Sequence, residues 1–191
     1  KIIHYGNFKT KKNQSFISFI ELISKPSNIL NKITIVEGWS KNKLNEELSK
    51  FFENFRAIEY DEILADTYFF HQNQDFDSFL NNIKKYKVNY LKNKKKELNY
   101  NYYTNEEIMI IGSLIEREGL DYDDKLKISS VIFNRLNKNM KLQIDATVVY
   151  VVTDGKNNLN RNLNYSDLKI INPYNTYVFK GLPPKPISYV G

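Results

Sequence analysis

The stretch TNEEIMIIGSLIEREG, residues 104–119, predicts a helix whose two ends are both marked in the sequence. Thr104 followed three residues later by Glu107 is a capping-box pattern, which typically opens a helix. Gly119 is a residue type that commonly ends one. Between these ends the apolar side chains recur at helical spacing, at Ile108, Ile111, Leu114 and Ile115. We therefore expect a helix with one apolar face directed at a core.

Two glutamates lie near the end of this predicted helix, and helical spacing separates them. Glu118 follows Leu114 by four residues and therefore continues the apolar stripe, whereas Glu116 points elsewhere. Desolvation and the negative end of the helix dipole would both raise the pKa of Glu118. A carboxyl group that stays protonated is suited to general acid catalysis of glycosidic cleavage. The pattern is not specific, because Glu118 could equally pair with an arginine such as Arg135 or lie at an exposed helix end.

The remaining sequence predicts an α+β fold, with a small strand-helix module over residues 1–57 and a mixed α/β part over residues 58–191. We expect strands over residues 1–8 and 32–37 and β-like backbone over residues 148–152. We expect helices over residues 16–23, 76–91 and 123–137, and one that begins after Ser40. Residues 92–103 are expected to form a polar connector, and the proline-containing tail to be irregular.

The composition excludes several kinds of functional site. Hydrophobic residues make up 41% of the chain and charged residues 26%, which is typical of a globular protein. No apolar run approaches the roughly 20 residues that cross a bilayer. The absence of cysteine excludes disulfides and thiolate sites. His4 and His71 are far apart in sequence, which disfavours a histidine metal centre. We therefore expect neither a metal nor a cofactor.

The formal net charge of +6 favours a polyanionic partner. Two tyrosines, Tyr86 and Tyr90, lie within a lysine-rich stretch. This stretch could follow a nucleic acid backbone with the tyrosines stacked on bases, but the solvated face of an amphipathic helix explains it more simply. No nucleic-acid motif accompanies it, so we do not expect nucleic acid as a partner. The lysines are Lys84, Lys85, Lys87, Lys92, Lys94, Lys95 and Lys96.

Five motifs occur in a fixed order along the second half of the chain. They are IGSLIERE at residues 111–118, VIFNRL at 131–136, LQIDATVVY at 142–150, NPYNTY at 172–177 and GLPP at 181–184. With these motifs the chain resembles the endolytic murein transglycosylase family (MltG/YceG-like). TIVEGW at residues 34–39 looks like the strand and turn of that family's LysM-like module, and ADTY at 65–68 looks like the start of its catalytic domain. The similarity covers most of residues 32–191.

The resemblance implies a reaction and a catalytic residue. Members of the family cleave the MurNAc-β-1,4-GlcNAc bond of nascent peptidoglycan strands without water, which leaves 1,6-anhydroMurNAc ends and limits strand length. The catalytic glutamate is the second one of a Glu-x-Glu motif, which matches Glu118. Our candidates for holding the sugar are Gln143, Asp145, Asn175 and Tyr177. Asp145 and Asn175 could instead form turns, and Tyr177 could pack in the core.

The resemblance also implies a location. The enzyme would work at the extracytoplasmic face of the bacterial inner (cytoplasmic) membrane, held by a single N-terminal transmembrane anchor that is absent from this chain. Its partners would be peptidoglycan glycan strands and, beyond these, cell-wall synthesis enzymes. Two residues depart from the family pattern: Ala146 stands at a common proline position, and Ile144 at the position of a small hydroxyl residue. Family members usually continue beyond the position of Gly191, so we expect a catalytic domain truncated at its C-terminus.

Two other function classes stay open. A muramidase-type hydrolase would use Glu118 as the acid and Asp145 as its partner carboxylate, and its product would be one water heavier. A non-enzymatic basic protein would bind polyanions through the lysine-rich stretch, with a strong dependence on salt and no dependence on Glu118. Glu116 is retained only as a residue that could support Glu118.

Overall fold

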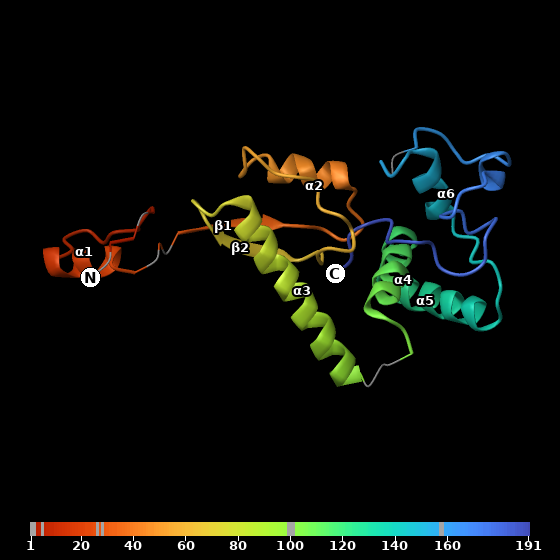
Figure 1. Ribbon diagram of the computed structural model, residues 1–191, viewed down its shortest axis with the longest axis horizontal. Helices are drawn as coiled ribbons and strands as arrows, with labels where there is room; N and C mark the ends of the chain where they lie inside the picture. The colour runs from red at the N-terminus through yellow and green to blue at the C-terminus, as the bar shows by residue number, and fades with distance from the viewer. Residues whose placement is uncertain (1–2, 5, 26, 28, 99–101, 157–158) are drawn as a thin grey trace.

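The computed structural model describes residues 3–4, 6–25, 27, 29–98, 102–156 and 159–191. The architecture is mixed α+β, as predicted, with a two-stranded sheet and six α-helices among these residues (Figure 1). The elements in chain order are α1 (Phe16–Ile23), β1 (Leu30–Thr34), α2 (Lys41–Leu48), β2 (Thr67–His71), α3 (Phe76–Leu98), α4 (Asn105–Glu118), α5 (Tyr122–Asn137), α6 (Asp145–Val152) and the 3-10 helix η1 (Asp167–Lys169).

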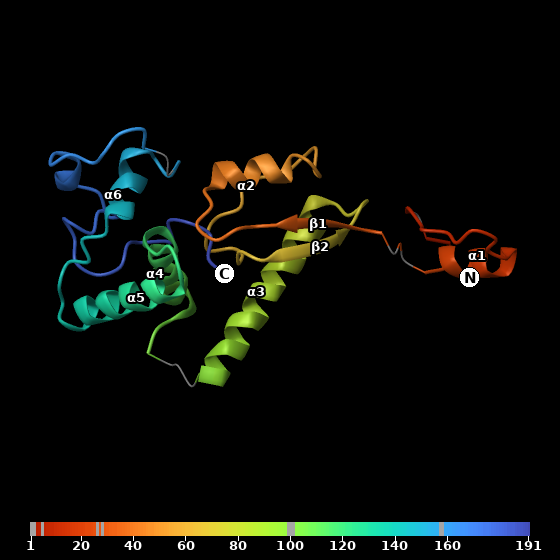
Figure 2. The ribbon, with the colours of Figure 1, turned by 180° about the vertical axis from the view of Figure 1, so that it is seen from behind.

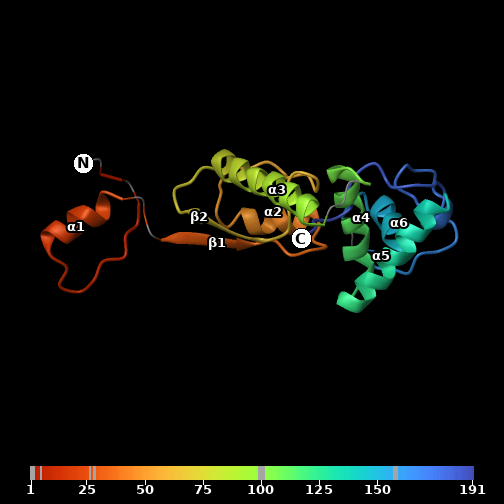
Figure 3. The same cartoon turned by 90° about the horizontal axis from the view of Figure 1, so that it is seen from below.

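The sheet and two helices form the first core. β1 and β2 are antiparallel, in a register that pairs Leu30 with His71 and Thr34 with Thr67. Helices α2 and α3 lie on the same side of the sheet (Figure 3). The sheet therefore buries alternate residues against these helices and leaves its other face open, where Phe69 is 64% exposed. The buried side chains include Ile33, Tyr68 and Phe70 of the sheet, Leu44 and Leu48 of α2, and Phe76, Phe79, Leu80 and Ile83 of α3.

The first core extends past the expected boundary at residue 57. Ile58, Tyr60 and Ile63 are buried in the same cluster as the residues of β1 and α2. β2 and α3, which also follow the boundary, supply further members of this cluster. A division at residue 57 therefore falls inside one hydrophobic core. The LysM-like character of the first part stays a prediction.

The second core lies between α4, α5 and α6. Its buried members include Ile111 and Leu114 of α4, Ile132 of α5 and Ala146 of α6. The predicted ends of α4 are confirmed: Thr104 and Glu107 form a complete capping box, and the helix ends at Glu118 with Gly119 as its C-cap. A β-carbon on Gly119 would lie 2.6 Å from Cγ of Lys125, so the approach of α5 requires glycine there.

The C-terminal segment joins the two cores. Ile187, Ser188 and Tyr189 are fully buried. The backbone N–H of Ile187 donates to Oγ of Ser113 in α4 at 3.1 Å. The hydroxyl of Tyr189 donates to the carbonyl of Ile58 at 2.6 Å, and its carbonyl accepts from the N–H of Gly38 at 2.9 Å. One short segment thus contacts both halves of the chain.

Several sequence-based expectations were wrong. Residues 148–152 belong to helix α6 instead of β-like backbone, because Thr147 and Val148 pack into the interior and this packing outweighs the β-propensity of the valines. Residues 92–98 continue helix α3 instead of forming a connector. The first strand covers Leu30–Thr34, two residues earlier than expected at its start. The described residues among 1–8 form no strand, and residues 1, 2 and 5 lie outside the described part.

Helix α1 lies at one end of the molecule, beyond the sheet (Figure 2). None of its residues is buried, although Phe16 and Ile17 are large and apolar. Within the described part of the chain, no helix combines the length and the apolar character needed to cross a membrane. The expected site residues lie on α4, on α6 and the segment just before it, and on the loop after η1.

Candidate active site

Glu118 is the last residue of α4, and its carboxylate faces the start of α6. Its Oε1 atom accepts a hydrogen bond from the backbone N–H of Ala146 at 3.2 Å. Ala146 is the second residue of α6, where backbone N–H groups have no partner within the helix and the helix dipole favours a negative charge. The arrangement therefore orients the Glu118 carboxylate through backbone alone.

The surroundings of Glu118 raise its pKa above the ordinary value. The largest cause is desolvation by neighbouring protein atoms, and the nearby charge of Asp145 acts in the same direction. The hydrogen bond from Ala146 and the charge of Arg117 oppose the rise. The side chain is nevertheless exposed. The expected buried stripe thus ends at Ile115, and Glu118 lies at the margin of the second core instead of inside it.

Asp145 and Tyr177 form a pair beside this carboxylate. The Tyr177 hydroxyl donates to Oδ1 of Asp145 at 2.5 Å. This bond raises the pKa of Tyr177 to about 12, with desolvation and the charges of Asp145 and Glu118 acting in the same direction. Asp145 is exposed and Tyr177 is half-buried. The structure therefore brings three of the predicted site residues, Glu118, Asp145 and Tyr177, close enough for their charges to interact.

Two buried threonines connect the motifs that carry these residues, and the sequence reasoning did not single them out. Thr147 is fully buried and Thr176 is 2% exposed. Their hydroxyl oxygens lie 2.9 Å apart. The Thr176 hydroxyl also accepts from the N–H of Ile144 at 2.9 Å, and its carbonyl accepts from the N–H of Gln143 at 3.1 Å. Their place inside two quoted motifs was the only signal in the sequence.

Gln143 and Asn175 differ in what they offer a ligand. Gln143 has an exposed side chain and a left-handed backbone, with φ of 52°. Asn175 is fully buried. Its side-chain amide donates to the carbonyls of Leu168 and Ile170, and its Oδ1 accepts from the N–H of Tyr177 at 2.9 Å. The Asn175 side chain thus shapes the loop that presents Tyr177 and is not exposed to a ligand.

The other charged residues near Glu118 have partners of their own. Glu116 forms an ion pair with Lys125, at 2.5 Å, and so points away from the site as expected. The Arg135 guanidinium donates to the carbonyl of Leu142. Arg135 therefore fixes the segment that leads into Gln143, which is a structural role different from the pairing with Glu118 that the sequence left open.

The two histidines line the same pocket although they are far apart in sequence. His4 and His71 both line a polar pocket of about 420 Å³, together with amide and hydroxyl side chains such as Asn7, Ser27 and Asn82. In the described ranges, no group of three or more His, Cys, Asp or Glu side chains is placed to hold a metal ion. We therefore assign no metal role to either histidine.

Comparisons with known proteins identify relatives of this chain. Over 102 residues the chain is 40% identical to the endolytic murein transglycosylase of Bacillus subtilis (strain 168), a match that covers 53% of this chain and 27% of that protein. It is 37% identical over 90 residues to the protein of the same name from Streptococcus pneumoniae serotype 2 (strain D39 / NCTC 7466), covering 44% of this chain and 16% of the other. The chain thus spans about a quarter or less of these relatives.

A solved structure supports the fold. The yceG-like protein from Listeria monocytogenes superposes with a TM-score of 0.66 at 21% identity, over 99% of this chain and 73% of the other. At this identity the likeness concerns the fold alone. A model of the YceG-like family matches residues 1–191, which is the full length of the sequence. The resemblance noted from the five motifs is therefore confirmed, and the chain belongs to the YceG-like family.

Proposed function

We propose that this chain is part of a peptidoglycan lytic transglycosylase in which Glu118 is the catalytic acid and base. The observation that carries the proposal is the setting of Glu118, whose carboxylate has a raised pKa and a backbone N–H donor from Ala146. A residue that must first give a proton and then accept one needs both features. The names of the relatives from Bacillus subtilis and Streptococcus pneumoniae point to the same reaction.

In the proposed reaction one carboxyl group serves both steps. Protonated Glu118 gives its proton to the leaving O4 oxygen as the bond from C1 of the muramic acid to O4 breaks. The resulting carboxylate then takes the proton of the C6 hydroxyl, whose oxygen forms the new bond to C1. The Ala146 N–H stabilises the carboxylate between these steps. Atoms balance without water, and Glu118 ends protonated as it began.

The product would carry a 1,6-anhydroMurNAc end, and cleavage inside a strand would limit strand length. Asp145 and Tyr177, whose charges interact with that of Glu118, and the exposed Gln143 just before α6 are the proposed contacts for sugar hydroxyl and acetamido groups. Asn175 is the proposed support of that loop. The proposed place of action is the extracytoplasmic face of the cytoplasmic membrane, on peptidoglycan glycan strands.

Product mass tests the proposal. A protein that contains residues 1–191 is incubated with purified peptidoglycan strands, and the products are measured by mass spectrometry. We expect products with anhydro ends, whose mass equals that of the substrate fragments without added water. Products that are one water heavier and have reducing ends would identify a hydrolase, in which Asp145 serves as the partner of Glu118. Salt-sensitive binding without any cleavage would identify a basic binding protein.

A further inference from the structure

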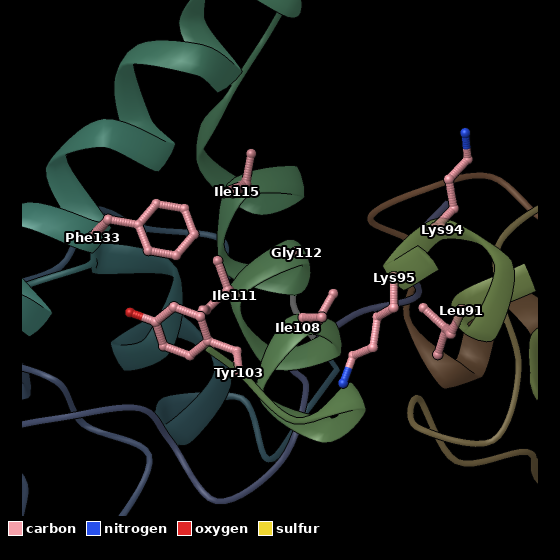
Figure 4. A pocket seen from close by; sticks show the side chains of 9 residues that line it. All are labelled: Leu91, Lys94, Lys95, Tyr103, Ile108, Ile111, Gly112, Ile115 and Phe133. Atoms are coloured by element: carbon pink, nitrogen blue, oxygen red, sulfur yellow. The ribbon is translucent and has the colours of Figure 1, made fainter. Parts of the chain in front are cut away.

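An apolar pocket lies between the end of α3 and helices α4 and α5, and we call it the α3–α4 pocket. Figure 4 shows its lining side chains, with those of α3 on one side and those of α4 and α5 on the other. Its volume is about 330 Å³, which is within the range of sites that hold small organic ligands. The lining residues are Leu91, Lys94, Lys95, Tyr103, Ile108, Ile111, Gly112, Ile115 and Phe133.

The pocket is separate from the candidate active site. Glu118, Asp145 and Tyr177 are not among its lining residues. Every lining residue is apolar, aromatic or glycine except the two lysines of α3. Lys94 forms an ion pair with Glu97 at 2.9 Å, and Lys95 is half-buried. A ligand of this pocket would therefore combine an apolar part with a negative group.

The lysines of α3 divide into two sets: three that have partners in the fold, among them Lys94 with Glu97, and four that form no ion pair among the described residues. Lys84 pairs with Glu62 at 2.8 Å, and Lys87 donates to the carbonyl of Asp61, so these two are used inside the fold. A second set lies on one face of the helix, because its members are spaced by three, four or seven residues. Within the described part of the chain these lysines form no ion pair. This lysine stripe consists of Lys85, Lys92, Lys95 and Lys96.

The lysine stripe leads to the α3–α4 pocket. Lys95 belongs to both, and Leu91, which lines the pocket, lies one helical turn before it. Val88 lies within the stripe and is 56% exposed. From Lys85 to Lys96 the helix rises about 16 Å, at 1.5 Å per residue. This length exceeds what a single anionic group needs, whereas a surface of many anionic groups would contact the whole stripe.

We propose that this face of α3 docks on an anionic lipid surface, with the lysine stripe over the headgroups and one acyl chain in the α3–α4 pocket. Anionic lipid carries a negative group and an apolar chain in one molecule, which matches the stripe and the pocket. Lysine clusters on amphipathic helices are attracted to such surfaces, and apolar side chains add to the binding. An acidic protein partner would match the charge but would not require an apolar pocket beside the lysines.

Vesicle binding by the 191-residue chain tests the proposal. Sedimentation is measured with vesicles of phosphatidylcholine alone and with vesicles that contain phosphatidylglycerol. We expect binding only to the anionic vesicles. Lys92→Gln with Lys95→Gln should weaken it about 25-fold, at about fivefold per lysine, and the effect should fade as salt rises. Lys50→Gln with Lys180→Gln is the matched control, because these exposed lysines lie outside α3.

A second variant isolates the pocket. Ile108 lines it but is not part of the hydrophobic clusters, so Ile108→Asn should leave the fold intact by circular dichroism. Removing its apolar contact with an acyl chain should weaken binding about tenfold at any salt concentration. Equal binding to both kinds of vesicle, binding to neither, or wild-type binding by Ile108→Asn would overturn the proposal. Wild-type binding by Ile108→Asn would mean that the lysines attract the vesicles without any acyl chain in the pocket.

Discussion

Glu118 and Glu116 lie two residues apart in the sequence but have different surroundings. Glu118 accepts one backbone hydrogen bond and has a raised pKa, whereas Glu116 is neutralised by Lys125. We expect Glu118→Gln to reduce the rate of anhydro-end formation by at least 10²-fold, about the contribution of general acid-base catalysis. Glu116→Gln removes a partly buried ion pair that lies outside the site and should retain most of the activity. The measurement is product formation by mass spectrometry. Equal losses in the two variants would contradict the assignment.

Glu118→Gln should not destabilise the protein at neutral pH. The pKa of folded Glu118 lies above its ordinary value, so ionisation opposes folding. The stability that the protonated carboxyl group contributes to the folded state is present at acidic pH and is lost as the pH rises through the raised pKa. A glutamine side chain does not ionise and has no such dependence. We therefore expect the free energy of unfolding of Glu118→Gln at pH 7 to equal or exceed that of the wild type, measured by urea unfolding. A clear loss would mean that the carboxylate has a structural role.

Asp145 is expected to contribute to the upper pH limit of the reaction. Its negative charge raises the pKa of Glu118, so Asp145→Asn should lower that pKa. The acid form of Glu118 would then be lost at lower pH, and the alkaline limb of the kcat profile should move to lower pH. Asp77→Asn, an exposed position on α3, is the control and should leave the profile unchanged. An alkaline limb that stays in place in Asp145→Asn would show that this charge does not act on Glu118.

At the scale of elements, two threonine pairs allow a matched comparison. The buried hydroxyls of Thr147 and Thr176 lie 2.9 Å apart, and the exposed hydroxyls of Thr34 and Thr67 lie 3.0 Å apart. Thr176→Val leaves the N–H of Ile144 without its acceptor inside the protein. We expect a loss of about 1–3 kcal/mol in the free energy of unfolding, together with lower activity. Thr34→Val should cost less than about 0.5 kcal/mol. Similar costs for both variants, measured by urea unfolding, would contradict the proposed role of burial.

Local signals in the sequence predicted some elements well. The capping box of Thr104 and Glu107 predicted the start of α4 and Gly119 predicted its end, because both signals act within one helix. The predicted helix over residues 76–91 begins at Phe76 as expected, and the carboxylate of Asp75 before it accepts from the N–H of Ser78 at 2.8 Å. Where the decisive contacts are local, pattern and structure agree.

Other features depend on contacts between distant segments. The valines of α6 favour strands by propensity, but the buried bonds of Thr147 to Ile144 and Thr176 place them in a helix. The expected buried position of Glu118 was only partly right, because the periodicity of α4 does not reveal that α6 begins beside its last turn. The motifs nevertheless identified Glu118, Asp145 and Tyr177, which lie near one another in the structure. They did not predict that Asn175 is buried.

At the scale of the whole molecule, the C-terminal segment makes the two cores depend on each other. Val190 packs so closely on α4 that a β-carbon on Gly112 would lie 2.6 Å from its Cγ1. The carbonyl of Val190 accepts from the N–H of Ala65 at 2.6 Å. The position of α4, and with it Glu118, is thus tied to the segment before β2. Mutations in this segment should therefore affect a site that they do not touch.

Tyr189 is the residue at which this coupling can be measured. Its ring is fully buried and lies 4.8 Å from that of Tyr60, and its hydroxyl donates to the carbonyl of Ile58. Tyr189→Phe leaves that carbonyl unsatisfied and should cost about 1–3 kcal/mol in the free energy of unfolding. Tyr189→Ala adds a cavity and should cost about 3–5 kcal/mol. Tyr122→Phe, at a position that is 75% exposed, is the control and should cost almost nothing.

The form of the unfolding curve shows whether the cores are coupled. With Tyr189 present we expect a single transition by both circular dichroism and tyrosine fluorescence, because neither core is complete without the C-terminal segment. In Tyr189→Ala the first core loses the ring and hydroxyl contacts with that segment and keeps backbone hydrogen bonds, such as those from Gly38 and Ala65. Ile187 still binds Ser113 of α4. The two halves should then unfold at different urea concentrations, with the half that contains the sheet unfolding first. A single transition in Tyr189→Ala, at nearly the wild-type urea concentration, would mean that contacts other than this side chain hold the cores together.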